Sequence, residues 1–95
     1  MIKTGELKAL HDSCQGFYGK AKVIQSGYWM VLQSYGTNVC RINTNGEVIL
    51  TVSYSDCSST TLRHIKEFLL QCGKQADNKK QIFMEYGVDL KARDL

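Results

Sequence analysis

The sequence contains no proline and a single tryptophan, and it has no long uninterrupted hydrophobic run. The absence of proline fits a compact unit without rigid hinges. Because a membrane span needs about 18 consecutive apolar residues, no segment is predicted to cross a bilayer. Residues 1–6 lack the apolar core of a signal peptide, so export is not expected. These absences favour a protein that works in the cytoplasm.

The length and composition favour one folded domain. The chain has 95 residues, of which 43% are hydrophobic and 22% are charged, and these proportions exclude a disordered or membranous protein. A chain this short buries a smaller fraction of its surface than a larger chain does, so its stability margin is expected to be thin. We predict a single domain over residues 1–95, with residues 88–95 as a loosely held tail.

The cysteines are widely spaced and include no C-x-x-C pair. In a chain without an export signal, such cysteines are expected to be buried, reduced thiols. A zinc site would need clustered ligands, and His11-x-x-Cys14 supplies only half of one. No metal and no cofactor is therefore predicted. The four cysteines are Cys14, Cys40, Cys57 and Cys72.

The net charge of +3 is concentrated in one segment of the chain. Residues 58–80 contain five basic and two acidic residues, which accounts for the whole excess and leaves the remainder neutral. This segment is compatible with an acidic partner or with nucleic acid. It is nevertheless far weaker than the dense basic stripe of a dedicated nucleic-acid binder.

The first periodic segment runs from Thr4 to Tyr18 and is predicted to be a helix. Its apolar residues recur at three- and four-residue steps, which places them on one helical face. Thr4 is expected to cap this helix, and Gly19 suits the left-handed position just after its end. The residues of the apolar face are Leu7, Leu10, Cys14 and Phe17.

Between residues 20 and 54 the apolar period changes to two, which predicts three to four strands, the last covering residues 47–54. Short connections, including the hairpin signal Asn45-Gly46, predict an antiparallel meander. The expected register turns Met30 and Leu32 toward the helices. The opposite face then carries Trp29, Val31, Gln33 and Tyr35, joined either by Cys40 and Ile42 or by Val39 and Arg41.

After a loop rich in capping residues, a second helix is predicted up to Cys72, where Gly73 stops it. A third, shorter helix is expected to begin after a cap at Asp77 or Asn78 and to end at Gly87. The predicted fold class is α+β. It consists of a helix, an antiparallel meander of three to four strands, and two helices packed on one face of the sheet.

No catalytic motif is present in the sequence. The glycines are scattered rather than gathered in a phosphate loop, and no G-x-S-x-G or H-E-x-x-H pattern occurs. A triad could be written from Cys57 or Ser58 with His64 and Asp56. However, a hydroxyl at the start of a helix is more often a cap than a nucleophile. The sequence therefore does not predict an enzyme.

Two surfaces are candidates for binding a partner. One lies on the second helix, where Arg63, His64 and Lys66 are expected near the electropositive helix start, beside an outward-facing Leu70. The alternative for His64 is that its ring packs over the sheet edge and bonds locally. The other surface is the sheet face with Trp29 and Tyr35, suited to a partner strand, self-association or stacked bases. The alternative there is a reversed register or a covering C-terminal helix.

Three segments carry a resemblance to a group of small proteins encoded by phages and other mobile elements of low-GC Gram-positive bacteria. They are Leu32 to Thr37, Tyr54-Ser55, and the run Thr60-Thr61-Leu62-Arg63-His64-Ile65-Lys66-Glu67-Phe68-Leu69. The likeness covers most of residues 7–73. The usual pattern passes from Tyr-Ser almost directly into Ala-Thr-Thr, and residues 56–59 lengthen that passage here.

This resemblance brings no established activity and no catalytic residue. It implies a phage accessory protein that binds a host protein or nucleoprotein complex in the cytoplasm of the bacterial cell. Accessory proteins of this kind include inhibitors of CRISPR and other defence systems. We therefore expect a protein-binding, anti-defence module, with a homodimer as a further option. The alternatives are a small nucleic-acid-binding domain, whose affinity falls steeply with salt, and, less favoured, a small hydrolase or transferase.

Overall fold

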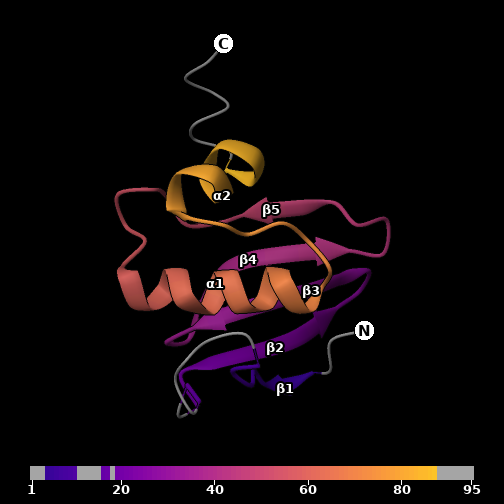
Figure 1. Cartoon of the computed structure of the whole chain (residues 1–95). Coiled ribbons are helices and arrows are strands. Elements are labelled where there is room, and N and C mark those ends of the chain that lie inside the picture. Colours follow the sequence, from indigo (N-terminus) through magenta and orange to yellow (C-terminus); the bar gives the residue numbers. More distant parts are fainter. Residues whose placement is uncertain (1–3, 11–15, 18, 88–95) are drawn as a thin grey trace.

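A five-stranded antiparallel sheet forms the centre of the protein, as seen in a computed structural model that describes residues 4–10, 16–17 and 19–87. The strands follow one another in chain order across the sheet (Figure 1). This arrangement confirms the predicted antiparallel meander and adds a short first strand. The strands are β1 (Gly5–Glu6), β2 (Ala21–Ser26), β3 (Trp29–Ser34), β4 (Thr37–Asn43) and β5 (Val48–Leu50).

Two helices follow the sheet, α1 (Ser59–Gln71) and α2 (Lys79–Tyr86). Helix α1 crosses one face of the sheet over β3 and β4, whereas α2 lies beside β5 (Figure 1). The Ser58 and Asn78 side chains accept hydrogen bonds from backbone N–H groups in the first turns, as N-caps do. Gly73, with φ of +76°, follows the end of α1 in the left-handed conformation. The α+β class and both helices are thus confirmed.

The prediction of an N-terminal helix is wrong over residues 4–10, because the first element of the described chain is the strand β1. Glu6 pairs with Lys22 on the edge of β2, and the Leu7 N–H donates to the Ala21 carbonyl at 2.9 Å. Gly5 has φ of +111°, which a helix does not use. Pairing with the free edge of β2 overrode the helical period. The rest of that predicted helix falls mainly on residues outside the described part of the chain, as do Cys14 and the predicted tail.

The sheet has one face turned toward α1, and the predicted register of β3 is confirmed. Leu32 is fully buried on that face opposite Cys40, and Met30 pairs with Ile42 beside them. Arg41 therefore joins Trp29 and Val31 on the other face, whereas Val39, which that option placed there as well, is buried in the core. A register shift after Leu32 leaves Val39 as an extra, buried residue. The core also includes Phe68 and Leu69 of α1 and Phe83 of α2.

The last strand is shorter than residues 47–54. The Thr51 N–H still donates to the Val39 carbonyl, but the chain then turns, and the Cys57 N–H donates to the Ser53 carbonyl. Gly87 forms a parallel bridge with Leu50, so the end of α2 meets the outer edge of β5. No helix within the described ranges is long and apolar enough to cross a membrane.

Three cysteines lie in the described part of the chain, and none forms a disulfide. Cys40 is completely buried in the core, whereas Cys72 is partly exposed at the end of α1. Burial raises the pKa of the Cys40 thiol far above its ordinary value, and burial also raises the pKa of Cys72. Because only the thiolate is a strong nucleophile, both thiols are expected to react slowly and Cys40 slowest.

Alkylation of the native protein with iodoacetamide is expected to modify Cys72 at least roughly tenfold faster than Cys40. The physical reason is that Cys40 becomes accessible only when the sheet separates from α1. Mass spectrometry of the tryptic peptides resolves the two sites. In denaturing urea the two rates should converge, and equal rates in the native state would contradict this placement of Cys40.

Candidate functional site

The sheet face that points away from α1 is the first candidate, and we call it the exposed sheet face. Alternation along the strands brings a row of side chains together across it, since Val31 pairs with both Ile24 and Arg41. Arg41 in turn pairs with Ile49 of β5. This face is defined by Lys22, Ile24, Trp29, Val31, Arg41 and Ile49.

Arg41 and Trp29 form the centre of the exposed sheet face. The guanidinium carbon of Arg41 lies 4.4 Å from the centroid of the Trp29 ring, so the cation stacks on the aromatic face. The Nε of Arg41 is buried and has no hydrogen-bond partner within the described part of the chain. Val31, beside them, is only 8% exposed, while Ile24 is 39% exposed. The result is an amphipathic surface with a cation and an aromatic ring at its centre.

Tyr35 does not belong to this face, contrary to the prediction from alternation. It follows the end of β3 in a turn with Gly36, where its φ of +54° lies in the left-handed region. Its ring is exposed, and its centroid lies 5.8 Å from that of His64 on α1. The turn therefore rotates Tyr35 toward the helix side of the sheet.

His64 is buried rather than presented to a partner, with 1% of its surface exposed. Its Nδ1 lies 2.8 Å from the Ser34 hydroxyl of β3, and that hydroxyl lies 3.1 Å from the Thr61 hydroxyl. The Phe17 ring packs edge-on against the imidazole, with centroids 4.6 Å apart. This placement matches the alternative interpretation, in which His64 packs against the sheet and bonds locally.

The other residues of the predicted helix surface differ in how exposed they are. Arg63 and Lys66 are exposed, but Leu70 is half-buried and packs against the core. Glu67, one turn after Arg63, is buried and accepts a hydrogen bond from the Gln71 amide at 2.9 Å. The same Gln71 amide donates to the Lys8 carbonyl, so this side of α1 lies against the N-terminal segment.

The triad that could be written from the sequence is not assembled by the contacts described. The Ser58 hydroxyl caps α1, accepting from the Thr61 N–H at 3.1 Å and donating to the Thr61 hydroxyl at 3.2 Å. Burial raises the pKa of the Cys57 thiol. His64 Nδ1 is engaged with Ser34, which is itself 2% exposed. These side chains thus serve the packing of α1 on the sheet.

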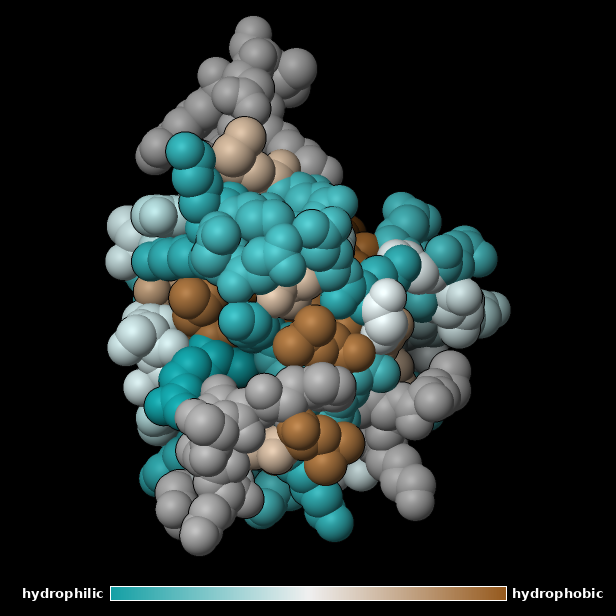
Figure 2. Space-filling model, in the orientation of Figure 1, coloured by the Kyte–Doolittle hydropathy of each residue, from teal (hydrophilic) through white to brown (hydrophobic). Residues whose placement is uncertain are grey.

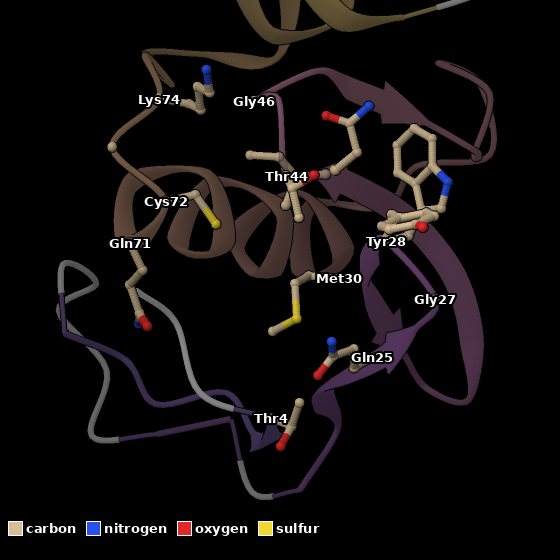
Figure 3. Close-up of a pocket in the computed structure, with 14 residues that line it drawn as sticks. Thr4, Gln25, Gly27, Tyr28, Met30, Thr44, Gly46, Gln71, Cys72 and Lys74 are labelled. Carbon is tan, nitrogen blue, oxygen red and sulfur yellow. The ribbon is translucent and has the colours of Figure 1, made fainter.

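A pocket at the C-terminal end of α1 is the second candidate, and no sequence pattern predicted it. It has a volume of about 880 Å³ and opens between the end of α1 and the tips of two hairpins (Figure 3). Met30 and Cys72 point into it, while Gln25, Gln71 and Thr44 lie around its rim (Figure 3). The surface around the two helices is otherwise largely hydrophilic, with small hydrophobic patches (Figure 2).

No group of three histidine, cysteine, aspartate or glutamate side chains that could hold a metal ion occurs among the residues described. The His11-x-x-Cys14 half-site lies outside them. The two candidates thus differ in shape, since one is a sheet face and the other is a pocket.

A comparison with protein-family models matches residues 5–85 to a family of unknown function, DUF8033. The chain belongs to this family. The match begins at β1 and ends within α2, so the family covers the sheet and both helices. No curated protein and no solved structure matches the chain.

Proposed function

We propose that the protein is an accessory protein of a phage or mobile element that binds a host protein through its exposed sheet face. The observation that carries this proposal is the stacked pair of Arg41 and Trp29, set among Ile24 and Ile49. Arginine and aromatic residues are the types that contribute most at protein interfaces. The protein acts in the cytoplasm of the host bacterium.

The chemistry of the exposed sheet face specifies the kind of partner. An aliphatic row flanks one guanidinium, that of Arg41, on this face. A partner that packs apolar side chains on this row and presents a carboxylate to the terminal nitrogens of Arg41 would suit both features. The cations of this face, Lys22 and Arg41, supply too little charge for tight sequence-independent contact with phosphates. A protein with an acidic patch is therefore favoured over nucleic acid.

The proposed biological role, in a phage or mobile element, rests on the resemblance to small phage and mobile-element proteins. Proteins of that kind often act by binding and disabling a host machine, and CRISPR and other defence systems are among their targets. A small rigid sheet with a preformed binding surface suits such a role, because little conformational entropy is lost on binding.

Charge reversal at Arg41 tests this proposal. A tagged protein expressed in its host and purified at moderate salt is expected to retain a host protein, identified by mass spectrometry. Arg41→Glu should reduce that recovery by roughly tenfold or more, because a like charge then faces the partner's carboxylate. Ile24→Glu should act in the same direction by placing a charge in the apolar row.

Lys80→Glu on α2 is the matched control, since it makes the same charge change on an exposed residue away from the face. A loss with Arg63→Glu or Lys66→Glu but not with Arg41→Glu would move the interface to α1. Recovery of nucleic acid alone, lost steeply with added salt, would replace the proposal with nucleic-acid binding. Recovery of untagged copies of this chain alone would identify a homodimer instead.

A functional assay separates the anti-defence role from binding alone. In a bacterium with an active defence system, expression of the protein is expected to raise the plating efficiency of a targeted phage, and Arg41→Glu should abolish the effect. Unchanged plating across the defence systems of the host would contradict the inhibitor role.

A further inference from the structure

We propose that the pocket at the end of α1 binds a small amphipathic carboxylate, a molecule with an unbranched or flat apolar body and one acid group. This inference rests on the pocket alone and is independent of the proposed partner surface. It assigns a ligand site to a part of the molecule that the exposed sheet face does not use, apart from Trp29, which contributes to both.

The pocket lies beyond the C-terminal end of α1, beside the hairpin ends of β3 and β4. The helix ends at Gln71, and the chain turns away at Gly73, where the Lys74 N–H donates to the Leu69 carbonyl. The hairpin ends of β3 and β4 extend past that point and keep Met30 and Ile42 on the same face as the core. These side chains form an apolar floor that no described helix covers.

The walls of the pocket combine apolar and amide groups. Cys72 faces the floor from the helix side, and burial raises the pKa of its thiol, which keeps it neutral. Gln25 and Gln71 lie on opposite sides of the opening (Figure 3). A neutral, partly apolar hollow with a few polar groups at its rim is typical of small-molecule sites, which have volumes of roughly 300–1,000 Å³.

Lys74 determines the charge of the ligand. It is the one charged residue among the described residues that line the pocket, and it is half-buried. Its side chain lies against Gly46, since a Cβ placed there would be 3.0 Å from Nζ. Nζ has no hydrogen-bond or ion-pair partner among the described residues. A flexible lysine at the rim of an apolar hollow favours an anionic ligand over a cationic one, and a carboxylate supplies the charge with little bulk.

Octanoate is a suitable probe, with 1-octanol and octylammonium as ligands of the same length but different charge. Trp29 lines the pocket and is the only tryptophan, so its fluorescence is expected to change saturably as octanoate is added. The octanoate affinity should exceed that of 1-octanol by roughly tenfold, the contribution of a charge-assisted hydrogen bond. Octylammonium should bind more weakly still.

The methionines provide an internal control for the site. With methyl-labelled methionine, the NMR signal of Met30 should shift with octanoate, whereas that of Met84, which is exposed on α2, should not. Lys74→Gln should reduce octanoate affinity by roughly tenfold and leave that for 1-octanol unchanged. Lys80→Gln, an equivalent loss of charge on α2, should change neither. Circular dichroism confirms that each variant is folded.

Equal affinity for octanoate and 1-octanol would overturn the role of Lys74. Equal shifts of Met30 and Met84, or no saturable change up to millimolar octanoate and 4-phenylbutanoate, would overturn the site itself. Because the assay uses the isolated protein, a negative result for the pocket does not contradict the proposal of a host-protein partner. Likewise, failure to recover a host protein does not contradict ligand binding in the pocket.

Discussion

Replacing Phe83 with alanine is expected to lower the free energy of unfolding by about 3–5 kcal/mol, the largest single loss we predict. Phe83 is 1% exposed and joins α2 to the main core, and its ring meets the Tyr54 ring edge-on with centroids 5.3 Å apart. Few other residues of α2 are buried, so the helix depends on this contact and on Ile82. In a small domain such a loss is a large part of the total stability.

Urea titration followed by circular dichroism measures this effect, with Trp29 fluorescence as a second signal from the sheet. Phe83→Leu keeps most of the apolar volume and should cost about 1 kcal/mol. Met84→Ala is the matched control, because Met84 is the adjacent, exposed residue and its truncation should be nearly neutral. A loss below about 1 kcal/mol for Phe83→Ala would show that α2 contributes little to the fold.

The second large effect is expected from Ser34→Val, at about 2–3 kcal/mol of lost stability. Valine suits a strand and leaves no cavity, although its extra methyl group adds some crowding at this buried site. Most of the cost comes from the hydroxyl, which bonds His64 Nδ1 at 2.8 Å and the Thr61 hydroxyl at 3.1 Å in a site closed to solvent. Removing it takes away the described partner of a buried ring nitrogen.

Ser26→Val provides the comparison, since Ser26 is also on a strand but is exposed. It should be neutral or slightly stabilising. NMR of the imidazole signals offers an independent reading, because the His64 resonance should move in Ser34→Val and stay in place in Ser26→Val. If the two valine variants were equally stable, the hydrogen bonds around Ser34 would have no energetic role.

Local patterns in the sequence predicted most of the regular elements correctly, since both of the helices and the strands from residue 21 onward depend on short-range signals. Capping residues and glycines mark the ends of α1 and α2, and alternation over residues 29–34 turns Leu32 inward and Trp29 outward. The prediction for the N-terminal segment was wrong because its apolar residues have helical spacing, but strand pairing with β2 determines its structure. Leu7 and Phe17 are buried in the core all the same, yet Leu10 of the same stripe is 69% exposed.

The candidate sites were less predictable. Trp29 was identified from alternation, but its partner Arg41 depended on the register between β3 and β4, which a bulge shifts near Leu32. His64 was a candidate from the sequence, but its burial depends on the orientation of α1 on the sheet, which the sequence pattern left open. No local pattern in the sequence predicts the pocket. Met30 of its floor and Lys74 of its rim are distant in sequence, and only the packing of α1 on the sheet brings them to the same pocket.

The spacing of the apolar residues, the capping residues and the turn signals determined the class of molecule, a small α+β domain in which two helices follow the sheet. These properties are local or compositional, so they can be inferred from residue spacing alone. Only the tertiary structure decided which surfaces are available. The pairing of β1 with β2, the placement of Arg41 on Trp29 and the hollow beyond α1 all depend on long-range packing, for which a single sequence carries no local signal.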